Sequence, residues 1–343
     1  MRQLSTSILL AAALSAGIAH AAELTVVNFG GANSNAQKFA YVEPFEKATG
    51  NKVVVVEYNG EMAKVKAMVE AKKVSWDLVE IESGEIGRAC DEGLLEKMDH
   101  DKLGKKADFM PQAFHECGFG TFVWSTVLGY DADKLKTAPK NWADFWDVKK
   151  TPGKRGMRKG ARYNLEFALM ADGVPTKDVY NVLATKAGVD RAFKKLDELK
   201  GNIQWWEAGA QPPQFLVAGD VVMSTVFNGR IDAAQREGKH LAITWAGAIY
   251  DLDYWVIPKG AKNKDLAEKF IAFSSTPEAQ QNYASKIAYG PVNINTFKRL
   301  DNKTLANLPT STANVKDSVQ QNLKFWTDHG EELEQRFTAW AAK

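Results

Sequence analysis

The sequence has few of the residues on which stapled folds and metal sites depend. It contains two cysteines and five histidines among 343 residues. Two cysteines are too few for a disulfide scaffold or a zinc site of four thiolates. Lys and Arg total 44 against 42 Asp and Glu, so the chain also lacks the bulk positive charge of a nucleic-acid binder. At about 150 residues per domain, the length predicts two core-forming units.

Catalytic motifs are also missing. The sequence contains no G-x-S-x-G, H-E-x-x-H or C-x-x-C and neither of the glycine patterns that bind nucleotide phosphates, so we expect no cofactor. The pair Asp251 and Asp253 suits acid–base chemistry, because residues i and i+2 of a strand point to one face. A secreted hydrolase that uses this pair is therefore one hypothesis. Two carboxylates on one face suit the binding of a cation at least as well.

Residues 1–22 have the features of a secretory signal peptide. Arg2 supplies a positive charge, and the apolar stretch Ile8–Ile18 is too short to span a membrane. Ala19-His20-Ala21 fits the small-x-small cleavage pattern, which predicts cleavage near Ala21 or Ala22 and export of the mature chain.

Export places Cys90 and Cys117 in an oxidising compartment. This favours one disulfide, which would close a loop of about 28 residues and contribute on the order of 3 kcal/mol. Two buried free thiols are the alternative. No second pair of ligands lies near these cysteines at a zinc-like spacing, so we expect no metal site.

Strands and helices alternate along the mature chain. Its first part predicts strands at 24–29, 52–58 and 76–81 with helical patterns between them, which is typical of a parallel sheet with helical crossovers. Ligands bind at the carboxyl ends of the strands in such sheets. Later strands are predicted at 121–130, 221–227 and 249–257. The basic stretch Lys149–Gly160 predicts a surface loop, without the interleaved aromatics of a nucleic-acid patch.

Two charged residues predict a binding site. Asp253 lies in a segment that also contains Tyr250, Tyr254 and Trp255, and a carboxylate ringed by aromatics can hold an organic ammonium group. Arg230 follows a predicted strand, where its guanidinium group can bind a carboxylate or phosphonate in a bidentate manner.

Several segments, in this order and spacing, resemble the periplasmic solute-binding proteins of ABC importers, in the branch that binds polyamines. These segments are Asn28-Phe29, Trp76-Asp77-Leu78-Val79, Glu92-Gly93-Leu94-Leu95, Trp142–Trp146, Phe227-Asn228-Gly229, Asp253–Pro258 and Ala288–Pro291. The resemblance runs through nearly the whole mature chain.

The resemblance implies an α/β protein of two lobes, each a mostly parallel sheet flanked by helices, with the ligand in the cleft between them. Residues 23–127 and 255–300 would form one lobe, and residues 128–254 and 301–343 the other. Hinges are expected near Val123–Leu128 and Tyr250–Trp255. The resemblance further implies a periplasmic receptor without enzymatic activity. A monomer that delivers its ligand to a permease in the inner membrane is therefore expected.

The resemblance also implies site residues. In that family an aspartate at the place of Asp253 receives an ammonium group. Aromatic residues at the places of Phe29, Phe227 and Tyr289 line the slot, and the loop at Glu82-Ser83 contributes polar contacts.

The sequence departs from the polyamine pattern, however. Asp251 stands where an aromatic residue is typical, and Arg162 and Tyr163 stand near the place of an acidic cluster that holds a distant amine. Asn228-Gly229-Arg230 is similar to the subgroup that binds ω-amino acids such as 4-aminobutyrate, where the arginine binds the carboxylate. The segment Trp205–Gln211 is similar to that subgroup as well.

The electrostatic cost of placing an arginine in the site also favours a ligand of this subgroup. A desolvated arginine beside a polycation would cost on the order of several kcal/mol, and an anionic end on the ligand relieves that cost. The sequence therefore favours an ω-amino acid over a polyamine, with 2-aminoethylphosphonate as a third candidate.

Overall fold

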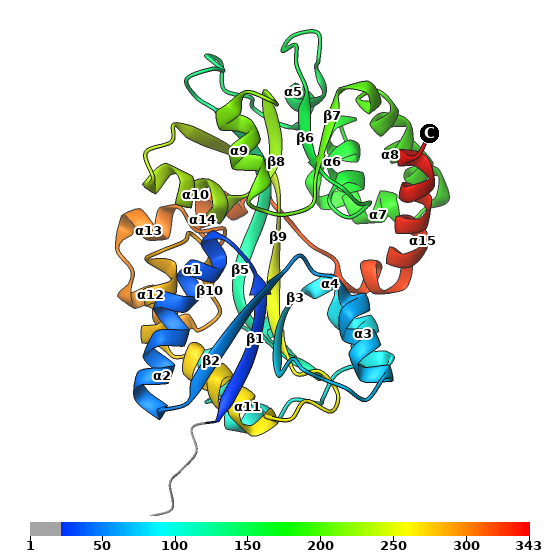
Figure 1. Ribbon diagram of the computed structural model, residues 1–343. Helices are drawn as coiled ribbons and strands as arrows, with labels where there is room; N and C mark the ends of the chain where they lie inside the picture. Colours follow the sequence, from blue (N-terminus) through cyan, green and yellow to red (C-terminus); the bar gives the residue numbers. More distant parts are fainter. Residues whose placement is uncertain (1–21) are drawn as a thin grey trace, which may run out of the picture.

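The computed structural model describes residues 22–343, so the predicted signal peptide lies almost wholly outside the described residues. The first lobe is built around three parallel strands, β1 (Glu23–Phe29), β2 (Lys52–Tyr58) and β3 (Leu78–Glu82), in the order β2-β1-β3. The connecting helices are α1 (Ala32–Gln37), a π-helical turn (Lys38–Val42), α2 (Glu43–Thr49) and α3 (Met62–Glu70), and α4 (Ser83–Asp91) follows β3. The predicted β-α-β-α-β pattern is therefore confirmed (Figure 1).

The second lobe is built around β8 (Met223–Phe227), β6 (Arg155–Arg158) and β7 (Ile203–Trp206), with β6 parallel to both of its neighbours. Six helices belong to this part of the chain: α5 (Trp142–Trp146), α6 (Asn164–Ala171), α7 (Val179–Leu183), α8 (Lys186–Asp197), α9 (Gln211–Ala218) and α10 (Asn228–Arg236). They pack beside the three strands in the upper part of Figure 1.

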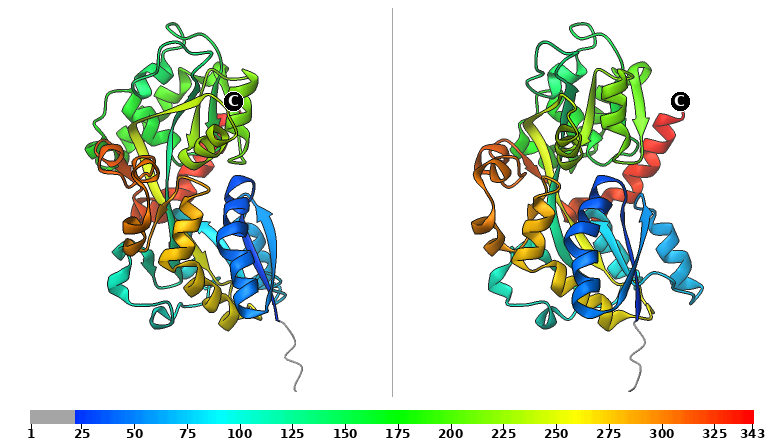
Figure 2. Two further views of the ribbon diagram at one scale, coloured as in Figure 1. Left: turned by 90° about the vertical axis from the view of Figure 1, so that its left-hand side faces the viewer. Right: turned by 60° about the vertical axis from the view of Figure 1, so that its left-hand side comes forward.

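Two long strands run through both lobes. β5 (Gly118–Asp131) and β9 (Leu241–Val256) pair antiparallel with each other. β9 also pairs with β3 of the first lobe, and β5 with β8 of the second, so one sheet continues in the order β2-β1-β3-β9-β5-β8-β6-β7. The views in Figure 2 show these strands crossing between the lobes. Both predicted hinge segments lie within them, and the pairing register shifts between Thr126 and Leu128.

The chain ends in a series of shorter elements: α11 (Lys264–Ser274), α12 (Pro277–Ala284), β10 (Gly290–Pro291), α13 (Asn302–Ala306), α14 (Thr312–Val315), β11 (Val319–Gln320) and the long α15 (Leu323–Ala341). α15 packs against α4 of the first lobe, and its end reaches the second lobe, where the Trp340 indole donates to Asp197. None of the helices within residues 22–343 is both long and apolar enough to cross a membrane.

The prediction of a surface loop over Lys149–Gly160 is wrong in part, because β6 lies inside it. Arg155 is fully buried, and its Nε and Nη1 atoms each donate a 2.7 Å hydrogen bond to a backbone carbonyl, of Phe145 and Gly153 respectively. The strand is four residues long and carries arginine at both ends. Such a short, charged segment has no sequence pattern that predicts a buried strand. Internal hydrogen bonds make this burial possible.

The predicted disulfide is confirmed. Cys90 in α4 is bonded to Cys117 just before β5, with a Cα–Cα distance of 5.8 Å, and no free cysteine is left in residues 22–343. The bond ties the helix after β3 to the strand that crosses into the second lobe.

Replacing both cysteines with alanine should lower the free energy of unfolding by about 2–4 kcal/mol, because the unfolded chain gains conformational entropy. Guanidinium titration followed by tryptophan fluorescence measures the change. Wild-type protein unfolded in the presence of a reductant serves as the control and should show a similar loss. An unchanged midpoint would contradict a stabilising role for this bond.

Candidate functional site

A cavity of about 240 Å³ lies between the lobes. Its volume falls below the range of about 300–1,000 Å³ that is usual for drug-sized ligands, so it suits a small molecule. The first lobe contributes the carboxyl ends of its parallel strands, and the second lobe contributes the ends of β6 and β8. The lining residues are Phe29, Gly30, Gly31, Asn33, Glu57, Tyr58, Asn59, Glu80, Glu82, Phe122, Trp124, Arg158, Glu207, Ala208, Gly209, Ala210, Phe227, Arg230, Asp253 and Tyr289.

Asp253 lies in the wall of this cavity on the crossing strand β9. It is 4% exposed, and the Trp124 indole on β5 donates a 2.6 Å hydrogen bond to its Oδ1. In the β3–β9 register Asp253 stands opposite Glu82. Burial raises the pKa of Asp253 well above its usual value, and the nearby carboxylates of Glu80 and Glu82 raise it further. In the part of the chain that the structure describes, no salt bridge balances this carboxyl group.

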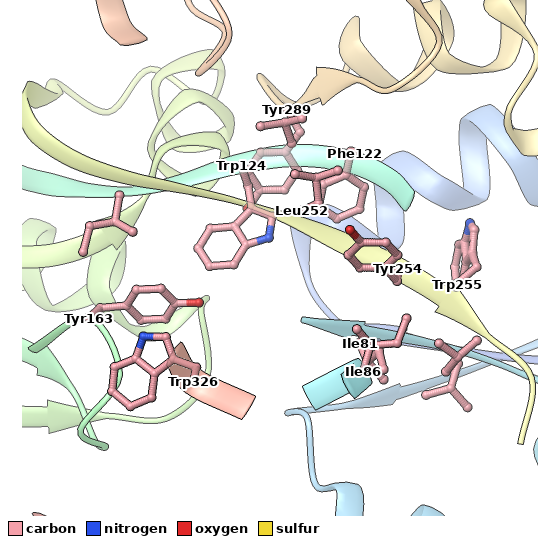
Figure 3. Packing of buried hydrophobic residues seen from close by; sticks show 14 of the residues in the cluster. Ile81, Ile86, Phe122, Trp124, Tyr163, Leu252, Tyr254, Trp255, Tyr289 and Trp326 are labelled. Carbon is pink, nitrogen blue, oxygen red and sulfur yellow. The ribbon is translucent and has the colours of Figure 1, made fainter. Parts of the chain in front are cut away.

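Aromatic rings gather beside Asp253. Phe122 and Tyr289 stack with their centroids 4.9 Å apart, and Trp124 meets Phe227 edge-on at the same distance. Figure 3 shows Phe122, Trp124 and Tyr289 together near the ribbons of β5 and β9. Ring faces beside a carboxylate attract an organic cation through their quadrupoles as well as through the charge.

Arg230 brings a cation to the same cavity from the first turn of α10. Its Nη1 donates to the Gly30 carbonyl at 2.6 Å and its Nη2 to the Phe29 carbonyl at 3.0 Å, so the side chain bridges the two lobes. The Nε–H finds no partner among residues 22–343 although Arg230 is only 6% exposed. Because a guanidinium group has five N–H donors, Arg230 keeps donors for an anionic ligand group.

Glu82 is already compensated by two arginines of the second lobe. Arg158 Nη1 lies 2.7 Å from Glu82 Oε1, and Arg162 Nη1 lies 3.6 Å from Glu82 Oε2. Arg162 also pairs with Glu85 at 2.9 Å. These ion pairs join the end of β3 to the end of β6 and to the loop that follows it. Glu82 therefore contributes to the contact between the lobes more than to any free negative charge in the cavity.

The structure brings most of the predicted site residues together. Six of them line the cavity: Asp253, Arg230, Phe29, Glu82, Phe227 and Tyr289. Three others do not. Ser83 is buried at the start of α4, and Tyr250 is half-buried with its hydroxyl 3.3 Å from Gln320 Oε1. Gln211 accepts hydrogen bonds from the Glu207 and Ala208 backbone N–H groups, so it shapes the loop that lines the cavity.

The aromatic residues that surround Asp253 also differ from those that the sequence predicts. Successive residues of a strand point to opposite faces, so Tyr250 and Tyr254 cannot face the same way as Asp253. Tyr254 donates instead to the Gln112 carbonyl at 2.6 Å. Asp251 lies outside the residues that line the cavity, and its Oδ1 accepts from the Leu252 N–H. The two aspartates of the hydrolase hypothesis therefore do not share this cavity.

Sequence reasoning missed several lining residues, of which Glu80, Trp124 and Arg158 carry the most chemistry. Glu80 precedes Glu82 by two positions on one strand, and this spacing alone places both on the same face. Trp124 reaches Asp253 only through the pairing of β5 with β9, for which the sequence holds no local signal. Arg158 lies in the stretch Lys149–Gly160, for which the sequence predicts a surface loop.

The chain belongs to the bacterial extracellular solute-binding proteins, whose family model matches residues 40–312. It is 58% identical to the γ-aminobutyric acid-binding protein of Pseudomonas aeruginosa, over 95% of this chain and 92% of that protein. It is 25% identical to the spermidine/putrescine-binding periplasmic protein of Salmonella typhimurium, over 76% and 75% of the two chains. Among solved structures, that of the Atu4243-GABA receptor has a TM-score of 0.82 and 37% identity, over 94% and 98% of the two chains.

Proposed function

We propose that this protein is the periplasmic substrate-binding component of an ABC importer and captures a small ω-amino acid, such as 4-aminobutyrate (γ-aminobutyric acid). Asp253 receives the ammonium group and Arg230 the carboxylate, while Phe29, Phe227 and Tyr289 enclose the carbon chain. The ligand bridges the two lobes, stabilises their closed arrangement, and is passed to a membrane permease without covalent chemistry. The receptor acts as a monomer after cleavage of its signal peptide.

One observation carries the proposal: a buried acid and a buried base line the same small cavity. A zwitterion with charges at opposite ends compensates both groups at once. A diamine would leave the Arg230 guanidinium beside a second positive charge in a desolvated site, which costs free energy. The relatives named for γ-aminobutyric acid support the same ligand class.

A diamine such as putrescine is the second candidate. Five carboxylates but only two arginines line the cavity, and this excess of negative charge favours a ligand with a net positive charge; the carboxylates are Glu57, Glu80, Glu82, Glu207 and Asp253. The relative named for spermidine and putrescine supports this class.

Titration calorimetry with 4-aminobutyrate, putrescine, spermidine and 2-aminoethylphosphonate tests the proposal. We expect one 4-aminobutyrate per chain, bound more tightly than either polyamine. Tight binding of putrescine without binding of 4-aminobutyrate would reject the ligand class. Absence of saturable binding by all four would reject the receptor function, and turnover of an amide or ester would favour an enzyme.

Replacing Trp124 with phenylalanine should weaken 4-aminobutyrate binding by about 10- to 100-fold. The change keeps a ring in place but removes the N–H that donates to Asp253, and a hydrogen bond to a charged group contributes about 1.5–3 kcal/mol. Trp146→Phe is the matched control, because its indole donates to the Lys195 carbonyl away from the cavity. Equal affinities of both variants would show that Trp124 does not position Asp253.

A further inference from the structure

We infer that the ammonium subsite is a pair of carboxyl groups, Glu80 and Asp253, which shares one proton in the ligand-free protein and releases it when the ligand's ammonium group binds. This inference rests on the proposed function only in requiring a ligand that carries an ammonium group. It assigns to Glu80 a direct part in ligand selection and makes binding a proton-releasing step.

The two carboxyl groups meet because β3 and β9 are antiparallel neighbours. In their register Asp253 stands opposite Glu82, and Glu80 is two residues from Glu82 on the same face. Glu80 and Asp253 are thus diagonal neighbours across two strands, a separation that long side chains span. Both line the cavity, so the two carboxyl groups share one small space between the lobes. Two buried carboxyl groups in one space repel each other when both are ionised, and a proton on one of them removes that repulsion.

No cation of the described residues forms an ion pair with either carboxyl group. Glu80 accepts hydrogen bonds from the side-chain amides of Asn33, at 2.9 Å, and Gln37, and Asp253 accepts one from the Trp124 indole. All three donors are neutral. Within residues 22–343 no lysine, arginine or histidine nitrogen lies within 4.0 Å of either carboxyl group, whereas Glu82 has two arginine partners. Two buried carboxylates this close cannot both ionise without a counter-ion.

The groups that surround the two carboxyl groups do not take up the shared proton. Four tyrosines face it from other elements, and burial raises the pKa of each phenol, so all four stay neutral near pH 7. The cations nearby are the Arg158 and Arg162 guanidinium groups, which pair with Glu82, and Arg230, whose positive charge lowers the pKa of Glu80. The titratable and charged groups around the pair are Tyr41, Tyr58, Tyr283, Tyr289, Glu82 and Arg230.

The affinity for a ligand with an ammonium group should rise with pH. Burial raises the pKa of Glu80 to about 7 and that of Asp253 well above its usual value. An ammonium group beside the pair favours its ionised form and lowers both pKa values. A primary amine keeps its own proton up to a pKa of about 10. Affinity should therefore rise with pH around neutrality, by up to about tenfold per pH unit while one proton leaves per ligand bound.

Calorimetry at pH 7 in phosphate and in Tris measures this proton directly, because the two buffers differ in ionisation enthalpy. We expect the apparent binding enthalpy to differ between the buffers by the heat of transferring about one proton. Equal enthalpies in both buffers would overturn the inference. The titration uses 4-aminobutyrate or putrescine, whichever binds, since both carry an ammonium group. A wrong ligand class thus shows in the affinities, and a wrong proton assignment shows in the buffer dependence.

Glu80→Gln should abolish the proton release and flatten the pH dependence of affinity. The matched control is Glu166→Gln: Glu166 is also fully buried, accepts hydrogen bonds from Trp326 and Tyr180, and has a pKa raised to about 7 by burial, but it does not line the cavity. The Glu166→Gln protein should release as many protons per ligand bound as the wild type does. A Glu80→Gln protein that also does so would overturn the inference.

Infrared difference spectra of the wild-type protein provide a test that needs no variant. Ligand binding should remove a protonated-carboxyl C=O band, and an unchanged carboxyl region would overturn the shared proton. This measurement decides the question even if Glu80→Gln does not fold.

Discussion

Replacing Asp253 with asparagine should weaken 4-aminobutyrate binding by about 30- to 3,000-fold. Removing one partner of a buried charge pair costs about 2–5 kcal/mol, and each factor of ten in affinity corresponds to about 1.4 kcal/mol. Asparagine retains the shape of the side chain and an oxygen that can accept the Trp124 hydrogen bond. The loss therefore reports the missing negative charge under the ligand's ammonium group. Titration calorimetry at a pH slightly above neutrality measures it.

Asp251→Asn is the control for this variant. Asp251 is 3% exposed, lies two residues away on the same strand, and has a pKa raised by burial to about 7, but it does not line the cavity. The affinity of this variant should stay within about threefold of the wild type, since Asp251 is not part of the cavity wall. If Asp253→Asn binds as the wild type does, the ammonium group does not lie on Asp253.

Replacing Arg230 with glutamine should separate the two candidate ligand classes. The affinity for 4-aminobutyrate should fall by about 100-fold, because the variant loses a charge-assisted contact to the ligand carboxylate. Putrescine has no carboxylate, so its affinity should fall far less or rise. Arg230 also donates to the Phe29 and Gly30 carbonyls across the lobes, and losing those bonds weakens closure for both ligands. The ratio of the two affinities cancels that shared effect.

Arg236→Gln is the matched control on the same helix. Arg236 lies at the end of α10, pairs with Asp232 at 2.8 Å and does not line the cavity. Its ratio of 4-aminobutyrate to putrescine affinity should equal that of the wild type. An unchanged ratio in Arg230→Gln would mean that Arg230 only holds the lobes together.

The parts of the fold that the sequence predicts are those with a strong local pattern. The run Lys52–Tyr58 is rich in valine, and the predicted strand agrees with β2 at both ends. β6 has no such pattern: it is short, the buried Arg155 donates to the Phe145 and Gly153 carbonyls, and the half-buried Arg158 pairs with Glu82. Local propensity cannot report a strand whose burial depends on partners elsewhere in the chain.

The site also contains residues that the sequence predicts and residues that it does not. Phe29 and Phe227 each end a strand, where ligands of such sheets bind, so their positions were accessible from the sequence and the family resemblance. The partners of Asp253 were not. Its neighbours in sequence point away, and its indole donor and second carboxyl group come from β5 and β3, which lie beside β9 only after folding. Gln211 shows the converse, since a polar residue near the cavity supports a loop instead of lining it.

A crystal structure of the complex with 4-aminobutyrate tests the central claim most directly. We predict the ligand in the cavity between the lobes, with its ammonium nitrogen within about 3.2 Å of the Asp253 carboxyl group and its carboxylate within the same distance of an Arg230 nitrogen. A ligand with its carboxylate on Arg158 and its ammonium group away from both Glu80 and Asp253, or one bound outside this cavity, would contradict the account.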